Sequence, residues 1–252
     1  MIFATGKHAL ITGGGTGIGA GAARALAAAG AKVSLLGRRR EPLEAVAAET
    51  GGLAIVCDVT DPDAQARAFA EAREAFGPLD IVILNAGIGD SRPFLRTGRD
   101  SWNAIIATNL TALFDGAQLA LPDLQAPGKR LIIVASVAGL KGGAMAAPYV
   151  ASKHGAVGLT RSLALEFART GLTVNAICPS FVDTPMVDDS AARIANATGK
   201  GIDEARQLLA RANGNGRLIT VDEVTHAILQ LCHPDAGGVN GACVTIDGGT
   251  SA

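Results

Sequence analysis

The chain has 252 residues, of which 48% are hydrophobic and 18% charged, and its formal net charge is −1. A chain of this length can bury one substantial core, so we expect a single domain over residues 1–252. The near-neutral charge, with no long run of one sign, argues against nonspecific binding to DNA or RNA. The four cysteines are widely spaced, which favours buried reduced thiols over a disulfide or a metal site.

The beginning of the chain carries no sign of a membrane or secretory segment. A first strand is predicted near residue 8, and Arg24 and Lys32 interrupt the alanine-rich stretch that follows. Those charges argue against a span of the bilayer, and we expect no secretory leader before the strand. We therefore expect a cytoplasmic protein without a membrane partner.

Short apolar runs recur along the chain and predict strands at 8–13, 32–37, 53–58, 79–87, 130–136, 172–179 and 242–249. Most of these runs are apolar throughout, as in strands that are covered on both faces. Helical patterns lie between them, at 17–29, 40–50, 61–76, 100–125, 148–170 and 220–232. Regular alternation of this kind predicts right-handed crossovers. The expected fold is an α/β, Rossmann-type, doubly wound parallel sheet of about seven strands with helices on both faces.

A glycine-rich loop, TGGGTGIG at residues 12–19, follows the first predicted strand and opens the first helix. Gly13, Gly17 and Gly19 permit backbone conformations and close approaches that a Cβ would block. Free amides and the positive dipole end at a helix start suit a pyrophosphate. The spacing is G-x-x-x-G-x-G and differs from the general G-x-G-x-x-G fingerprint, so the glycines alone could mark only a tight turn. The strand before and the helix after favour a dinucleotide site.

The second predicted strand ends in Gly37-Arg38-Arg39-Arg40. NAD-binding sites usually have an acidic residue here, which holds the ribose hydroxyls and would repel a 2′-phosphate. An arginine guanidinium binds such a phosphate through two hydrogen bonds. Arg38 is the expected gripping residue, so NADP(H) is the predicted cofactor and NAD(H) a possible one. The alternative is a solvated basic helix start.

The single tyrosine of the chain, Tyr149, stands four residues before Lys153 in a predicted helix. Residues at this spacing share one helix face, so the ammonium can stabilise a phenolate whose pKa is ordinarily about 10. The phenol can then protonate a carbonyl oxygen during reduction, or take the proton back from an alcohol. Ser136 ends the fifth predicted strand and can donate to the same oxygen. A Y-x-x-x-K spacing alone is weak evidence for a catalytic site, because such pairs are frequent by chance. Its combination with Ser136 and the glycine loop is much stronger evidence.

These features resemble the short-chain dehydrogenase/reductase family, in its single-domain branch, over essentially the whole chain. The matching positions are 12–19, Asp58, the NAG at 85–87, Asn109, Ser136, Tyr149, Lys153 and Pro179. The resemblance implies a catalytic set of Asn109, Ser136, Tyr149 and Lys153, in which Asn109 supports a water relay to Lys153. No metal is implied.

The same resemblance implies a cofactor site. Asp58 and the Val59 backbone would hold adenine, Asn85 would line the cofactor cleft, and Thr184 would contact the carboxamide side. The full implied set is Gly13, Thr16, Gly17, Ile18, Gly19, Arg38, Asp58, Val59, Asn85, Gly87, Tyr149, Lys153, Pro179 and Thr184. The chain departs from the family at Ser180, where a glycine is usual, and at Thr16, a position that is basic in many NADP-dependent members.

The segment at 185–217 breaks the alternation of strands and helices. It is polar and contains Asn, Gly and paired charges. Long insertions after the carboxyl end of a strand often act as binding loops, so we expect a substrate lid. The alternative is a solvated helical excursion.

The expected function is reduction of a carbonyl by an NADP(H)-preferring enzyme, with a 3-oxoacyl thioester or a related β-keto compound as the substrate. AAPYVASKHG and RTGLTVNAICPSFVDTPM resemble 3-oxoacyl and polyketide reductases and 3-hydroxybutyrate dehydrogenases. The alternatives are an NAD-linked 3-hydroxy acid or other secondary-alcohol dehydrogenase, and a non-catalytic nucleotide sensor. A sensor would have no need of the Asn-Ser-Tyr-Lys set.

Three further expectations concern partners. Basic residues near the site could meet coenzyme A or an acidic carrier protein, or could be ordinary surface charge; they are Arg92, Arg96, Arg99, Lys141, Lys200 and Arg206. Met145, Phe181 and Met186 would form an apolar wall for an acyl chain. Helix 148–170 carries more apolar surface than one sheet face requires, which together with the resemblance predicts a homotetramer.

Overall fold

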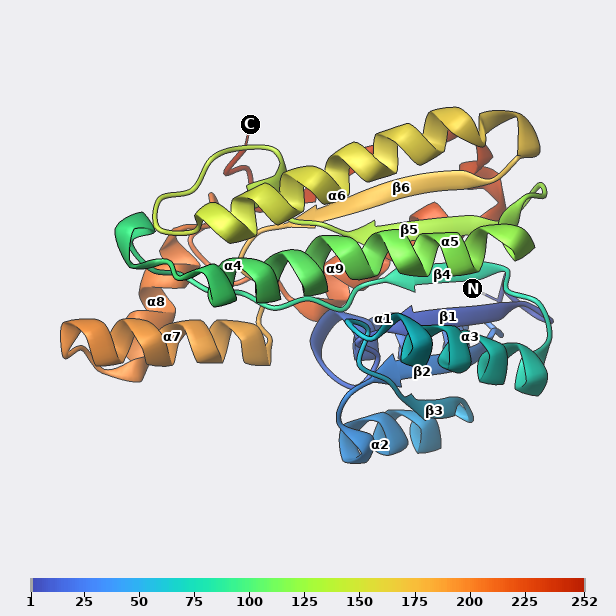
Figure 1. The fold of residues 1–252 in the computed structure, drawn as a ribbon, viewed down its shortest axis with the longest axis horizontal. Coiled ribbons are helices and arrows are strands. Elements are labelled where there is room, and N and C mark those ends of the chain that lie inside the picture. Colours follow the sequence, from blue (N-terminus) through green and yellow to red (C-terminus); the bar gives the residue numbers. More distant parts are fainter. Residues whose placement is uncertain (1, 252) are drawn as a thin grey trace.

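The computed structural model describes residues 2–251 and contains a seven-stranded parallel sheet in that range (Figure 1). The strand order is β3-β2-β1-β4-β5-β6-β7, which confirms the predicted doubly wound sheet. The third and fourth strands are shorter than the apolar runs that predicted them. The strands are β1 (His8–Thr12), β2 (Lys32–Gly37), β3 (Leu53–Val56), β4 (Ile81–Leu84), β5 (Arg130–Val134), β6 (Thr173–Pro179) and β7 (Cys243–Ile246).

The two faces of the sheet carry separate hydrophobic cores. Neighbouring strand residues alternate between them: Ile11 belongs to one core and Leu10 to the other, and both are fully buried. Helices α1 (Gly17–Ala28), α2 (Arg40–Thr50) and α9 (Val221–Cys232) cover the first face. Helices α3 (Pro62–Phe76), α5 (Ala112–Leu124) and α6 (Ala147–Glu166) cover the second. Covering on both faces explains why the strand sequences are apolar throughout.

Local sequence signals set several of the helix ends. Asp61 caps α3, because its carboxylate accepts hydrogen bonds from the backbone amides of Asp63 and Ala64, both at 3.0 Å. Pro62 occupies the first helical position, where a missing N–H costs nothing. Gly51, with a φ of 64°, ends α2 in the left-handed conformation.

The predicted helix 100–125 is one run with a widened turn in its middle. It consists of α4 (Arg99–Ile106), a π-helical turn (Ala107–Thr111) and α5. By length and composition alone, the run Arg99–Leu124 could cross a membrane. Its α5 part, however, packs on β4, β5 and α3, as the core helix of an α/β domain does. The π turn contains Asn109, and such turns often lie at functional sites.

The segment after β6 forms two helices, α7 (Pro185–Thr198) and α8 (Ile202–Arg211), which lie beyond the carboxyl ends of the strands (Figure 1). They pack together around a small core of their own, formed by Val187, Ala191, Ala205 and Leu209. The alternative interpretation of 185–217, a solvated helical excursion, is therefore correct in that the segment is mostly helical. That the pair acts as a substrate lid stays a prediction.

Candidate active site

The carboxyl ends of β1, β4, β5 and β6 meet at one edge of the sheet, where the strand order reverses between β1 and β4. From β1 the chain winds outward to β2 and β3, then returns to β4 and continues the other way. Ligands of open α/β sheets bind in the crevice that such a reversal creates. The sequence-predicted site residues come from the loops at this edge.

The glycine loop packs so closely against the end of β4 that side chains are excluded. Gly13 has a φ of +67°, and a Cβ on it would lie 2.8 Å from Nδ2 of Asn85. A Cβ on Gly19 would overlap the carbonyl of Gly13. Asn85 holds this arrangement, because its Nδ2 donates to the Thr12 carbonyl at 2.9 Å. Close backbone approach, and not merely a tight turn, explains these two glycines.

The first turn of α1 presents backbone amides toward the edge of the sheet. Thr16 occupies the N-cap position with extended backbone and makes no side-chain capping bond. Gly17, with a φ of +54°, and Ile18 follow it, and a Cβ on Gly17 would lie 3.1 Å from the methyl group of Thr184. The helix start, whose backbone amides no side chain caps, fits a pyrophosphate group.

Basic residues border the same loop. Arg39, which the sequence interpretation did not single out, lies with its Nη2 3.5 Å from the Thr16 hydroxyl. Hydrogen bonds from Thr60 and, to a smaller extent, the charge of Arg38 lower the pKa of Asp58. The side chain of Arg39 thus reaches Thr16, the position that is basic in many NADP-dependent members of the family that the sequence resembles.

Asp58 and Val59 follow the end of β3, next to the end of β2. The Asp58 carboxylate accepts from the amide of Thr60 at 3.0 Å and from its hydroxyl at 2.8 Å. Val59 is buried. Asp58 does not cap the following helix, because Asp61 caps α3. The adenine role of both residues remains a prediction.

Asn109 holds the chain just after β4. Its carboxamide donates to the carbonyl of Ile88 and accepts from the amide of the same residue, both at 2.8 Å. A Cβ on Gly87 would lie 3.3 Å from Oδ1 of Asn109 and 3.7 Å from Nζ of Lys153. Gly87 therefore lets the two side chains approach one another. The water relay between them stays a prediction.

Ser136, Tyr149 and Lys153 come together where β5 ends. Ser136 is buried, and its hydroxyl donates to the carbonyl of Pro179 at 3.2 Å. Nζ of Lys153 lies 5.7 Å from the centroid of the Tyr149 ring and donates to the carbonyl of Val134 at 2.9 Å. Lys153 is buried almost completely, although it carries a charge. A buried lysine beside a tyrosine and a serine is typical of an acid–base site.

The pKa of Tyr149 shifts in the direction opposite to the expected one. Desolvation raises it above the ordinary value, and a hydrogen bond with Ser136 opposes this only in part. Desolvation also lowers the pKa of Lys153, to about 8. Desolvation is thus the dominant influence on the phenol. Tyr149 consequently keeps its proton at neutral pH, in the form that can donate to a carbonyl oxygen.

The chain after β6 connects the catalytic side of the edge to the glycine loop. Pro179 ends β6 beside Ser136, and the amide of Ser180 donates to the carbonyl of Ile246 at 3.1 Å. Thr184 begins α7 at Gly17, and its hydroxyl donates to the carbonyl of Val182 at 3.2 Å. This segment thus spans the place where a nicotinamide would lie.

Three of the six cations of the predicted basic surface are neutralised by ion pairs. Arg92 pairs with Asp90, Lys200 with Glu204, and Arg206 with Asp183 and Asp188. These pairs favour the ordinary surface-charge alternative for the three cations. Within residues 2–251, the structure shows no ion pair for Arg96, Arg99 or Lys141.

The apolar wall is also smaller than predicted. Phe181 packs against the core of the α7–α8 pair, where it helps to hold these helices to the domain. Met145 and Met186 are exposed, and the sulfur of Met186 would lie 3.6 Å from a Cβ on Gly89. Two methionines therefore remain as candidates for contact with an acyl chain.

Comparison with known proteins shows the family of the chain and supports its fold. A family described as short chain dehydrogenase matches residues 7–195. D-beta-hydroxybutyrate dehydrogenase of Cupriavidus necator is 38% identical over 251 residues, covering 97% of this chain and 97% of that protein. The crystal structure of levodione reductase has a TM-score of 0.92 at 35% identity and covers 98% of each chain.

A crystal structure of a variant of actinorhodin polyketide ketoreductase with NADPH also has a TM-score of 0.92, at 31% identity over 97% of each chain. The match therefore extends over the sheet, both helical layers and the α7–α8 pair, well beyond the segment that the family match alone covers. The protein belongs to the short chain dehydrogenase family.

Proposed function

We propose that this protein is an NADP(H)-linked ketoreductase that interconverts a carbonyl and a secondary alcohol. The observation that carries the proposal is the convergence of Ser136, Tyr149 and Lys153 beside the glycine loop. Tyr149, protonated at neutral pH, gives its proton to the carbonyl oxygen, and Ser136 donates a hydrogen bond to the same oxygen. Lys153 stabilises the phenolate that this transfer leaves behind.

The cofactor fits the residues at the sheet edge. The uncapped start of α1 at Thr16 and Gly17 would supply backbone donors to a pyrophosphate, while Gly13 and Gly19 let the loop pack closely against the end of β4. Asn85 and Gly87 would border the cleft, Asp58 and Val59 the adenine, and Thr184 the carboxamide. When bound, the nicotinamide supplies the hydride.

The preference for NADP(H) over NAD(H) rests on two arginines. Arg38 directly follows β2, where an acidic residue would hold the ribose of NAD, and Arg39 reaches Thr16 from the next position. Two cationic forks would surround a 2′-phosphate there. The relative with NADPH in its crystal structure supports the same cofactor.

For the substrate, we propose a 3-oxoacyl thioester or a related β-keto compound. Two relatives support this class, one named a polyketide ketoreductase and one a D-beta-hydroxybutyrate dehydrogenase. The latter also favours a second candidate, NAD-linked oxidation of a 3-hydroxy acid. Both candidates use the same three catalytic side chains.

A substrate panel tests the proposal. We expect acetoacetyl-CoA and longer 3-oxoacyl thioesters to be reduced with a kcat/KM at least about tenfold above that of a simple cyclic ketone, since thioester contacts lower the barrier further. NADPH and NADH oxidation would be followed with each carbonyl, and NAD⁺ reduction with 3-hydroxybutyrate. Equal efficiency on thioesters and the cyclic ketone would exclude this substrate class. Cofactor binding with no turnover of any carbonyl would favour a nucleotide sensor.

The proposed assembly is a homotetramer that uses the outer faces of α5 and α6. The side chains of Phe114 on α5 and Leu165 on α6 are 47% and 81% exposed, and a Cβ on Gly158 would meet open space. Apolar exposure on neighbouring long helices marks an association surface. We expect light scattering at micromolar concentration to give the tetramer mass, and Phe114→Asp with Leu165→Lys to reduce it. A monomer mass for the unaltered protein would contradict the proposal.

A further inference from the structure

The segment that follows α8, residues 212–219, returns to the sheet edge and pairs with the chain after β6. The amide of Ile219 donates to the carbonyl of Phe181 at 2.9 Å, and the amide of Asp183 donates to the carbonyl of Ile219 at 2.8 Å. The two bonds form a parallel bridge between Val182 and Ile219. This post-lid segment therefore fixes the position of the chain that borders the proposed nicotinamide site.

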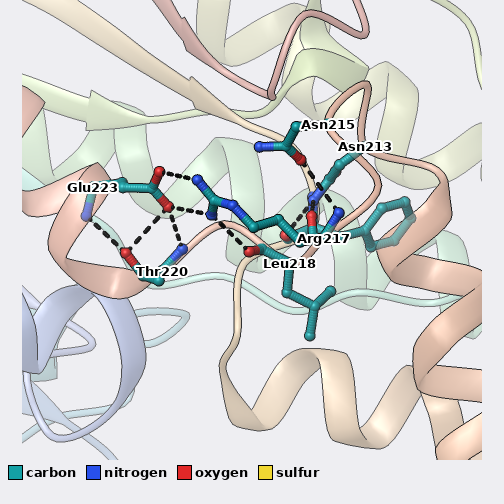
Figure 2. Close-up of polar contacts among 7 residues, drawn as sticks. Asn213, Asn215, Arg217, Leu218, Thr220 and Glu223 are labelled. Carbon is teal, nitrogen blue, oxygen red and sulfur yellow. Dashed lines mark hydrogen bonds and ion pairs between the residues drawn. The ribbon is translucent and has the colours of Figure 1, made fainter.

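Asn213 lies at the centre of this contact and is only 2% exposed. Its Oδ1 accepts from the amide of Phe181 at 3.1 Å, while its Nδ2 donates to the carbonyls of Phe181 at 2.9 Å and Arg217 at 2.7 Å. The carboxamide thus uses its acceptor and both of its donor hydrogens (Figure 2). A carboxylate of the same size would face two carbonyl oxygens, and alanine would leave buried backbone groups unpaired.

The post-lid segment is anchored to the body of the domain. Arg217 makes two hydrogen bonds to the Glu223 carboxylate, at 2.8 and 2.6 Å, and Glu223 closes a capping box with Thr220 at the start of α9 (Figure 2). Helix α9 packs on β5 and β6. The position of Asn213 is consequently set by the sheet and α9, and not only by the α7–α8 pair.

The peptide that Asn213 holds lies close to the reacting groups. Phe181 comes two residues after Pro179, whose carbonyl accepts from the catalytic Ser136. Three residues beyond Phe181, Thr184 meets Gly17 of the glycine loop. A displacement of the Phe181 peptide would therefore move both the serine contact and the approach to Gly17.

We infer that Asn213 is a positioning residue, which holds the segment Pro179–Thr184 against the nicotinamide half of the cofactor. The inference rests on the proposed function. The same device occurs across the cleft, where the carboxamide of Asn109 binds both the N–H and the C=O of Ile88 after β4. Each of the two asparagines thus binds both backbone groups of one residue, Ile88 after β4 and Phe181 after β6, the two strands that flank β5.

The test compares Asn213→Asp with Asn215→Asp, which makes the same chemical change at an exposed position of the same segment. We expect Asn213→Asp to lower kcat about 10²-fold, because small displacements of reacting groups have effects of this size. The affinity for 2′,5′-ADP, which lacks the nicotinamide, should stay unchanged. The deuterium isotope effect on kcat, measured with 4-deuterated NADPH, should increase because hydride transfer becomes slower. Asn215→Asp should leave all three quantities unchanged.

A pH series adds a readout that lost stability would not reproduce. Acid protonates the introduced carboxyl group and restores one donor, so the kcat of Asn213→Asp relative to the unaltered protein should increase as the pH decreases. Circular dichroism measures the folded fraction, and hydrogen exchange reports whether the Phe181 amide has lost protection. If Asn213→Asp does not fold, Asn213→Ser, which keeps a hydroxyl donor, takes its place and should show a smaller loss of kcat.

Two outcomes would overturn the inference alone. The first is a kcat of the folded Asn213 variant equal to that of Asn215→Asp. The second is an equal loss of 2′,5′-ADP and NADPH affinity with an unchanged isotope effect, which indicates general destabilisation. Failure of the unaltered protein to oxidise NADPH or NADH with any carbonyl would instead overturn the proposed function, and this inference with it.

Discussion

Replacing Tyr149 with phenylalanine is expected to lower kcat by about 10²- to 10⁴-fold, because the phenol is the only proton donor proposed at the reacting carbonyl. The ring, which packs beside Lys153, remains in the variant, so the fold and the affinity for NADPH should not change. Steady-state reduction of the best carbonyl of the panel measures kcat. Quenching or enhancement of NADPH fluorescence measures binding.

The neighbouring His154 offers a control for changes in the same helix. Its side chain is exposed, and its ring nitrogen lies 2.9 Å from the carbonyl of Val150, away from the catalytic groups. His154→Phe should retain kcat. Near-normal turnover by a folded Tyr149→Phe variant would exclude the proposed acid, and Ser136 or a solvent molecule would have to supply the proton.

The pKa shifts explain why the tyrosine needs its neighbours. In its partly buried position the phenol has a raised pKa because of desolvation, so it keeps its proton at neutral pH and releases it less readily than in water. In the proposed mechanism, Ser136 and Lys153 both stabilise the phenolate that follows proton release. Lys153→Met should therefore lower kcat as well, although the lysine does not itself give a proton to the substrate in the proposed mechanism.

Local patterns were sufficient to predict most of the architecture from the sequence. The continuous apolar runs marked β1, β2, β5 and β6 because a strand covered on both faces has no polar face. The predicted start of the helix at 61–76 agrees with α3, because its signal, the cap Asp61 followed by Pro62, is local. Tyr149 and Lys153 were found because their spacing alone places them on one helix face.

The remaining features depend on contacts between distant segments. Asn213 binds a peptide 32 residues away, and nothing in the sequence around it distinguishes it from the exposed Asn215. Arg39 reaches Thr16 across 23 residues, and three consecutive arginines gave no indication of which would point to the loop. The raised pKa of Tyr149 reflects burial, which the spacing of tyrosine and lysine does not encode.

The second large effect is expected at the end of β2. Arg38→Asp should reverse the cofactor preference, so that NADH becomes the better reductant. The introduced carboxylate would repel the 2′-phosphate of NADPH and could accept hydrogen bonds from the ribose hydroxyls of NADH. A hydrogen bond between charged groups contributes about 1.5–3 kcal/mol, so its loss alone changes the ratio of the two kcat/KM values by about 10- to 150-fold.

The three consecutive arginines allow a comparison with matched charge changes. Arg40 pairs with Glu44 on the exposed face of α2, and Arg40→Asp should leave the preference almost unchanged while altering the net charge by the same amount. Arg39→Asp should have an intermediate effect, because its fork lies near Thr16 rather than at the end of the strand. Equal use of NADPH and NADH by the unaltered protein would contradict the proposed preference. If all three variants lose NADPH affinity equally, the general positive potential of the surface, and not a fork at residue 38, attracts the phosphate.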